Sequence, residues 1–164
     1  FEWNGTTFQL EDWLEEHWTT GLVVMKRDGT TDARLLYESY HRGNDANSKC
    51  VSWSMCKSIT STLIGIAIDR DILPNIDVAT VTDYVPELKG SGYDGVRLKD
   101  VLQMSSGVAF NEDYHDPFSD INMMSYTLAL GFSMDSFVAT LRREREPGTY
   151  NHYVSIDTQV LAMV

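Results

Sequence analysis

The sequence predicts an α+β fold in which a β-hairpin comes first and helices follow. Two short apolar, β-prone runs at residues 20–26 and 33–40 are separated by a segment that contains Asp28 and Gly29, a dipeptide typical of hairpin turns. From residue 54 onward, most apolar residues recur at helical spacing. We therefore expect one early hairpin and a mainly helical remainder.

A short amphipathic helix is expected before the hairpin. Leu10, Trp13, Leu14 and Trp18 recur at three- and four-residue spacing, and acidic residues occupy the other face. Thr7 precedes this pattern and is the predicted N-cap residue, because a threonine hydroxyl can accept a hydrogen bond from the first helical turn.

The longest predicted helix covers residues 54–70. It is mostly apolar, and its polar residues gather near the start, a pattern that suits a buried helix. Shorter helices are predicted at residues 78–88, with a break near Pro86, at residues 98–104 and at residues 133–144. A loop is expected at residues 111–120 and a turn at residues 147–149, and Ser155 is the predicted N-cap of a last helix.

Composition and charge restrict the class of protein. The 164 residues are 43% apolar and include four tryptophans, which is enough for a sizeable core in one domain. The net charge is −11, and no segment gathers the basic residues, so nucleic acids and anionic membranes are poor partners. The longest apolar run, residues 63–68, is far shorter than the roughly 20 residues that span a bilayer.

Metal and disulfide sites have little support in the sequence. Cys50 and Cys56 do not form a C-x-x-C pair and are interpreted as packing residues. The four histidines are scattered and form no H-E-x-x-H motif, so no metal is expected. The acidic segment at residues 111–116 lacks the glycine and the final glutamate of a calcium loop, and a solvated acidic loop is expected there.

Both ends of the chain are interpreted as cuts. The chain begins with Phe1, and its last five residues form an apolar helical run without glycine, proline or a basic last turn. The lack of a signal peptide therefore does not indicate a compartment, and localisation is left open.

Ser54 and Lys57 form the strongest candidate for chemistry. If a helix begins at Ser54, the Lys57 side chain lies one turn later on the same face, within reach of the serine hydroxyl. A serine hydroxyl is a weak nucleophile until a base takes its proton, and a lysine can be that base. The S-x-x-K spacing also occurs by chance, so its position at the start of a long apolar helix matters.

Tyr153 is the second candidate. It follows the predicted turn at residues 147–149 and precedes the last helix, where a fold can hold a tyrosine hydroxyl in a cleft. A phenol can relay protons when a nearby cation lowers its pKa. A G-x-S-x-G motif does not occur, so a nucleophile of the α/β-hydrolase type is excluded.

Taken in order, these segments resemble the serine β-lactamase-like family of penicillin-recognising enzymes. The resemblance covers residues 21–164 and rests on four landmarks in register: the S-x-x-K segment at residues 54–60, V-P-E-L at residues 85–88, L-K-D-V-L-Q-M-S-S-G-V at residues 98–108, and P-G-T followed by Tyr153. Together the segments are most similar to the branch that contains class C β-lactamase-type carboxylesterases and 6-aminohexanoate-dimer (nylon oligomer) hydrolases, and the segment at residues 107–114 looks closest to the nylon-oligomer hydrolases.

The resemblance implies a fold and a chemistry. The implied fold is a helical domain beside an antiparallel sheet flanked by helices. Residues 1–164 are then the N-terminal part of one catalytic domain, with the first hairpin at about residues 20–40, the helical region at about residues 54–164, and the C-terminal strands missing. Ser54 would be acylated, Lys57 would accept its proton and Tyr153 would pass a proton to the leaving group, with Tyr114 and Ser155 contacting the substrate. The implied activity needs neither metal nor cofactor.

Two departures from the family pattern affect this interpretation. The second motif is usually Tyr-x-Asn, and Ser155 here replaces the asparagine that would hold Lys57 and the substrate. The third motif, of the K-T-G or H-x-G type, is absent, and in the family it supplies an oxyanion donor. We therefore expect the 164-residue chain alone to be inactive.

Several functions remain open at this stage. The preferred function is a serine hydrolase acting on small amides or esters, with a homo-oligomer as a possible assembly. One alternative is a non-catalytic binding or assembly module in which the S-x-x-K segment only packs a helix. Another is a β-lactamase or D-Ala-D-Ala peptidase on the same scaffold.

Overall fold

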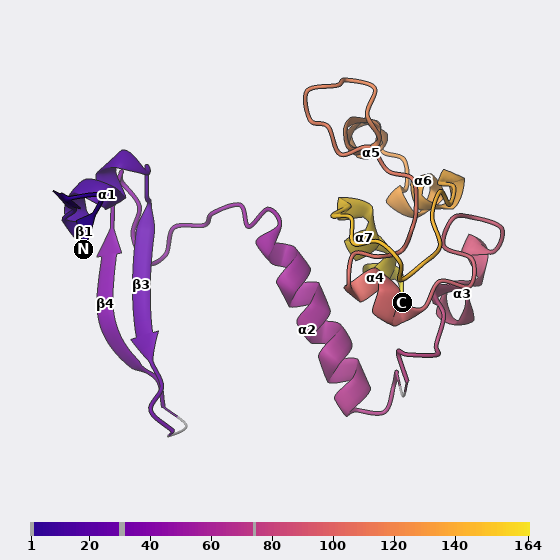
Figure 1. The fold of residues 1–164 in the computed structure, drawn as a ribbon, viewed down its shortest axis with the longest axis horizontal. Coiled ribbons are helices and arrows are strands. Elements are labelled where there is room, and N and C mark those ends of the chain that lie inside the picture. Colours follow the sequence, from indigo (N-terminus) through magenta and orange to yellow (C-terminus); the bar gives the residue numbers. More distant parts are fainter. Residues whose placement is uncertain (1, 30–31, 74) are drawn as a thin grey trace. The chain divides into compact units, whose positions relative to one another are not determined.

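The chain forms two compact units, Phe1–Val51 and Ser52–Val164. The structure is a computed structural model, and it describes residues 2–29, 32–73 and 75–164. Each unit is described by itself below, with its elements labelled as in Figure 1.

The first unit begins with a small hairpin that the sequence reasoning missed. β1 (Glu2–Trp3) pairs antiparallel with β2 (Thr6–Thr7) around Asn4 and Gly5, whose φ angles are +47° and +75°. Asn-Gly is a dipeptide that favours such a turn. The prediction of Thr7 as an N-cap is therefore wrong: Thr7 lies in β2, its hydroxyl donates to Glu2 Oε1 at 3.4 Å, and Gln9 precedes helix α1 (Leu10–Glu16) instead.

The predicted hairpin at residues 20–40 is confirmed. β3 (Gly21–Lys26) and β4 (Arg34–Tyr40) run antiparallel (Figure 1). Gly21 lies opposite Tyr40, and the register is irregular between Val24 and Met25. Thr30 and Thr31, in the connection between the strands, lie outside the described residues. Among the residues described in this unit, Leu14 is the only buried hydrophobic side chain.

The second unit is helical and contains most of the core. Its elements are α2 (Met55–Asp69), α3 (Val81–Tyr84), the 3₁₀ helix η1 (Pro86–Leu88), α4 (Leu98–Leu102), α5 (Asp120–Ala129), α6 (Met134–Thr140) and α7 (Ser155–Met163). Helix α7 packs against α2, α4 and α6, and Figure 1 shows α4 beside it. Side chains around α7 and α4 form the centre of the core, including Tyr93, Val96, Leu98, Val101, Ile156 and Val160.

Helix α2 has the predicted extent but not the predicted burial. In the described part of this helix only Ile64 is buried, whereas Ile59 and Leu63 are 63% and 60% exposed. The helix packs mainly against α7, so its other sides stay uncovered. The interpretation of Cys50 and Cys56 as packing residues is also wrong, because both are exposed.

Other predicted helices agree with the structure only in part. The predicted break near Pro86 in the helix at residues 78–88 is confirmed, because α3 ends at Tyr84 and the residue before a proline is disfavoured in helical conformation. Helix α6 ends at Thr140 rather than at residue 144, since Arg143 pairs with Val108 as an antiparallel bridge. Helix α5 was not predicted at all. Val154, not Ser155, is the N-cap of α7.

The predicted loop at residues 111–120 is present up to Ser119, because α5 already begins at Asp120, and the predicted turn at residues 147–149 is present. No helix in the described part of the chain is long and apolar enough to cross a membrane.

Candidate active site

Ser54 lies at the start of α2, but its hydroxyl does not cap the helix. It is the N-cap residue but has helical φ and ψ of −65° and −9°, and its side chain makes no capping hydrogen bond. Trp53 before it has a φ of +45°, a left-handed conformation that costs a non-glycine residue roughly 1 kcal/mol or more. This turn leads the chain into the helix and leaves the Ser54 hydroxyl free for other partners.

Lys57 reaches Ser54 from one turn along α2. Its Nζ donates to Ser54 Oγ at 3.0 Å, as the spacing of the motif predicts. The same Nζ lies 5.1 Å from the centre of the Tyr153 ring, which is within the range of a cation–π contact.

Tyr153 completes a three-residue cluster although it lies 99 residues after Ser54 in the sequence. Its hydroxyl donates to Ser54 Oγ at 2.7 Å. The Ser54 oxygen thus accepts from both Lys57 and Tyr153. Distances of 2.7 and 3.0 Å allow direct proton transfer between these groups.

Backbone hydrogen bonds hold the segment that carries Tyr153. Residues 142–152 run beside residues 103–109, with the His152 N–H donating to the Met104 carbonyl at 2.7 Å and the Gly148 N–H donating to the Ser105 carbonyl at 2.8 Å. The Asn151 side chain adds a bond to the Gln103 carbonyl at 2.7 Å. Two of the four sequence landmarks, residues 98–108 and the P-G-T turn, are therefore hydrogen-bonded to each other, and this pairing positions Tyr153.

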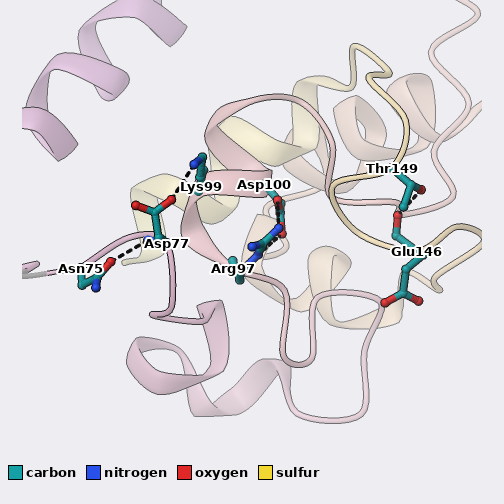
Figure 2. Close-up of polar contacts among 7 residues, drawn as sticks. All are labelled: Asn75, Asp77, Arg97, Lys99, Asp100, Glu146 and Thr149. Atoms are coloured by element: carbon teal, nitrogen blue, oxygen red, sulfur yellow. Dashed lines mark hydrogen bonds and ion pairs between the residues drawn. The ribbon is translucent and has the colours of Figure 1, made fainter.

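An ion pair supports the turn at residues 147–149. Asp100 is 2% exposed, and both its oxygens accept from the Arg97 guanidinium, at 2.7 and 2.8 Å (Figure 2). Gly148 packs on this pair so closely that an added Cβ would lie 2.8 Å from Asp100 Oδ1, and its φ is +76°. A side chain at this position would therefore displace either the turn or the ion pair.

The surroundings of Tyr153 favour its ionised form. Partial burial raises the pKa of Tyr153, but the Lys57 ammonium and the Ser54 hydroxyl outweigh burial, so the pKa lies below the ordinary value of a tyrosine. A phenol with a lowered pKa is better suited to exchange a proton near neutral pH.

A pocket of about 420 Å³ opens beside Ser54. Ser54, Lys57, Tyr114 and Ser155 line it together with mainly apolar side chains, among them Trp53, Ile121, Met124 and Met134. A larger cavity of about 590 Å³ lies between α3, η1, α6 and α7 and contains none of the predicted site residues. The smaller pocket is therefore the candidate binding site.

Glu112 is the site residue that the sequence reasoning missed. Its Oε1 accepts from the Ser155 hydroxyl at 2.5 Å and from the Tyr114 hydroxyl at 3.1 Å, and its Oε2 accepts from the Ser155 N–H at 2.6 Å. Ser155 therefore bonds to Glu112, where the family's asparagine would hold Lys57. The expectation of a solvated acidic loop is wrong at Glu112, which is partly buried and satisfied by protein donors.

The other acidic residues of the loop bind its own backbone. Asp113 and Asp116 accept from the backbone N–H groups of His115 and Phe118, each at 2.9 Å. Among the residues that the structure describes, no group of three or more His, Cys, Asp or Glu side chains is arranged to hold a metal ion.

Comparisons with known proteins identify the family of the chain. The Beta-lactamase family matches residues 10–164, and the chain belongs to this family. Over 163 residues it is 34% identical to a 6-aminohexanoate-dimer hydrolase of Paenarthrobacter ureafaciens, an alignment that covers 94% of this chain and 39% of that enzyme. The chain thus spans about two fifths of the length of this relative.

Two solved structures share the fold. One is named "Putative 6-aminohexanoate-dimer hydrolase from Bacillus anthracis" and has a TM-score of 0.75 at 20% identity, covering 96% of this chain and 42% of that protein. The other, named a "putative beta-lactamase" of Bacteroides dorei, has a TM-score of 0.65 at 21% identity, covering 94% of this chain and 43% of that protein. The expected β-lactamase-like α+β fold is confirmed.

Proposed function

We propose that this protein is a serine hydrolase that forms an acyl-enzyme at Ser54 with small amide or ester substrates, of the 6-aminohexanoate-oligomer hydrolase or carboxylesterase type. One observation carries the proposal: Lys57 and Tyr153 both bond to the Ser54 hydroxyl, and Ser54 borders a mainly apolar pocket. The relative from Paenarthrobacter, which is named a hydrolase of the 6-aminohexanoate dimer, supports the same class of reaction.

The proposed reaction has two steps. Ser54 Oγ attacks the carbonyl carbon of the substrate, and Lys57, after losing an ammonium proton to solvent, accepts the serine proton. The tetrahedral intermediate breaks its C–N or C–O bond, and Tyr153 passes its proton to the departing amine or alcohol and takes up the proton held by Lys57. Water then attacks the ester of Ser54 and gives a proton to Lys57, the acid leaves, and Lys57 returns this proton to the serine oxygen.

The backbone N–H of Ser54 is a candidate donor to the oxyanion. Within the described part of the chain it donates to no other group. An N–H directed at the developing negative charge stabilises the transition state.

A fluorophosphonate probe tests the proposal on the protein isolated from its native source. We expect one phosphonyl adduct, detected as a mass increase in the intact protein and located at Ser54 by peptide mapping. Ser54→Ala should remove the adduct. The matched variant Ser58→Ala, which changes an exposed serine one turn along α2, should keep it.

Labelling of another residue, or no labelling of the folded protein, would contradict the serine hydrolase and favour the binding module. If labelling occurs, turnover of a cephalosporin in preference to simple amides and esters would instead favour a β-lactamase.

A further inference from the structure

A buried hydrogen bond joins the first turn of α7 to a loop far away in the sequence. The Tyr93 hydroxyl donates to Asp157 Oδ1 at 2.7 Å, and both residues are 0% exposed. Tyr93 lies in the loop at residues 89–97, and Asp157 comes shortly after Tyr153 in the chain. Apolar residues of the same shape would fill this part of the core at similar stability, whereas a hydrogen bond also fixes the relative position of its two groups. The pair is therefore a candidate for holding geometry.

The loop that carries Tyr93 is bonded to the segment that leads to Tyr153. The Gly92 N–H donates to the Leu141 carbonyl at 2.8 Å, and Arg143 Nε donates to the Gly92 carbonyl at 3.1 Å. Gly92 packs so closely on this segment that an added Cβ would lie 2.8 Å from a backbone carbonyl carbon. The loop is thus a fixed support, and Asp157 is attached to it.

Tyr153 is therefore held on both sides along the chain. Before it, the backbone is hydrogen-bonded to residues 103–109. After it, the first turn of α7 is bonded to Glu112 on the pocket side and, through Asp157, to the core. A displacement of about 1 Å at a catalytic group can lower a rate by about 100-fold. The 2.7 Å contact between the Tyr153 hydroxyl and Ser54 Oγ depends on attachments of this kind.

We infer that Asp157 is a positioning residue: through its bond to the Tyr93 hydroxyl it holds the first turn of α7 so that Tyr153 stays within hydrogen-bond distance of Ser54. The inference rests on the proposed function. Both members of the pair lie in the core, whereas the pocket beside Ser54 is lined by other residues. Asp157 thus acts on the reaction through α7 and Tyr153.

The rate of fluorophosphonate labelling at Ser54 in the native-length protein tests this role. Tyr93→Phe removes one hydroxyl from the core, and we expect the labelling rate to fall about fivefold to tenfold, the effect of one lost hydrogen bond. Tyr84→Phe is the matched control. Tyr84 lines the larger cavity between α3, η1, α6 and α7, so its variant should label at the wild-type rate.

Two further variants separate position from stability. Asp157→Asn keeps an oxygen that can accept from the Tyr93 hydroxyl, so it should label within about twofold of wild type. Tyr93→Phe/Asp157→Leu replaces both polar groups with apolar ones of similar size, so its free energy of unfolding in urea should stay close to that of wild type. Its labelling rate should nevertheless fall as in Tyr93→Phe, and it carries the test if Tyr93→Phe alone fails to fold.

A double-mutant cycle shows whether the effect passes through Tyr153. In a Tyr153→Phe background, Tyr93→Phe should lower the labelling rate no further, because the hydroxyl that it positions is already absent. An effect of equal size in both backgrounds would overturn the inference. Wild-type labelling rates in the folded Tyr93→Phe/Asp157→Leu protein would also overturn it and leave the proposed function intact. A folded wild-type protein that takes no adduct at Ser54 would overturn both.

Discussion

Single residues at the start of α2 and α7 determine the chemistry of the site. The hydroxyl of Ser54 accepts two hydrogen bonds instead of capping its helix, and the partners come from one turn later and from 99 residues later in the sequence. The contact between Lys57 and Ser54 follows from helix geometry alone. The contact between Tyr153 and Ser54 forms only when the helical unit folds, so it is the stronger evidence for the site.

Tyr153→Phe removes that second contact and keeps the ring. We expect the rate of fluorophosphonate labelling at Ser54 to fall about 100-fold or more, the usual effect of losing a proton-transfer group. Tyr150→Phe is the matched control, because the Tyr150 ring contacts the Arg145 guanidinium instead. Equal labelling rates in wild type and Tyr153→Phe would show that Lys57 alone activates the serine.

Asp157 is a buried carboxyl group in the first turn of α7. Its side chain is fully buried, Oδ1 accepts from the Tyr93 hydroxyl at 2.7 Å, and Oδ2 has no hydrogen-bond partner among the described atoms. Burial raises the pKa of Asp157 to about 7, even though the Tyr93 hydroxyl and Ser106 act in the opposite direction. The folded protein therefore binds a proton that the unfolded chain releases at lower pH.

This proton gives stability a defined dependence on pH. Because the folded pKa is about 7 and the ordinary value is 3.8, the free energy of unfolding should fall as the pH rises from about 4 to 7, by on the order of 3 kcal/mol. Urea unfolding at several pH values measures this slope. Asp157→Asn should remove the Asp157 contribution, whereas Asp69→Asn, at an exposed site, should retain it. If Asp157→Asn and the wild type show the same dependence of the free energy of unfolding on pH, the Asp157 carboxyl is not the group responsible.

Elements differ in how far local sequence determines them. The hairpin β3–β4 and helix α2 were predicted because their patterns extend over many residues and end in recognisable turns. Residues 141–145 contain no such signal, and their extended form depends on pairing with residues 107–109. Local propensity cannot report a partner that lies more than 30 residues away.

The contacts of the candidate site also differ in how far local sequence determines them. The contact between Lys57 and Ser54 is local and was predicted, whereas the role of Glu112 depends on a partner 43 residues later in the sequence. An acidic residue two positions before Tyr114 is a weak signal by itself. The missed hairpin at Asn4 and Gly5 is different, because that dipeptide is a turn signal that could have been read.

The C-terminal end of α2 offers a test of element stability. Asp71 follows the C-cap residue Arg70 with a φ of +56°, and its N–H bonds to the Ile68 carbonyl. Glycine adopts this conformation without strain, and a negative charge at a helix C-terminus is unfavourable.

Asp71→Gly should therefore stabilise the protein by about 1 kcal/mol, measured as the free energy of unfolding in urea. Asp71→Ala removes the same charge but keeps a Cβ in the left-handed conformation, so it should gain less. If both variants gain equally, charge and not backbone conformation limits the end of this helix.

At the scale of the whole molecule, burial is uneven. The main hydrophobic cluster consists entirely of residues from the second unit, such as Val81, Leu98 and Ile156. In the described part of the first unit Leu14 alone is a buried hydrophobic residue, and apolar strand residues such as Met25 and Leu36 are exposed. A two-stranded hairpin without an apolar core is at best marginally stable in water.

The two units should therefore open independently in the 164-residue chain. Amide hydrogen exchange followed by mass spectrometry should show slow exchange for core amides of the second unit, such as that of Val81, which bonds to the Val96 carbonyl at 2.8 Å. Peptides from β3 and β4 should exchange at least about tenfold faster, because opening this hairpin exposes little buried apolar surface. Equal protection in both units would mean that the hairpin opens only when the whole chain unfolds, and that residues of the first unit contribute to one cooperative core.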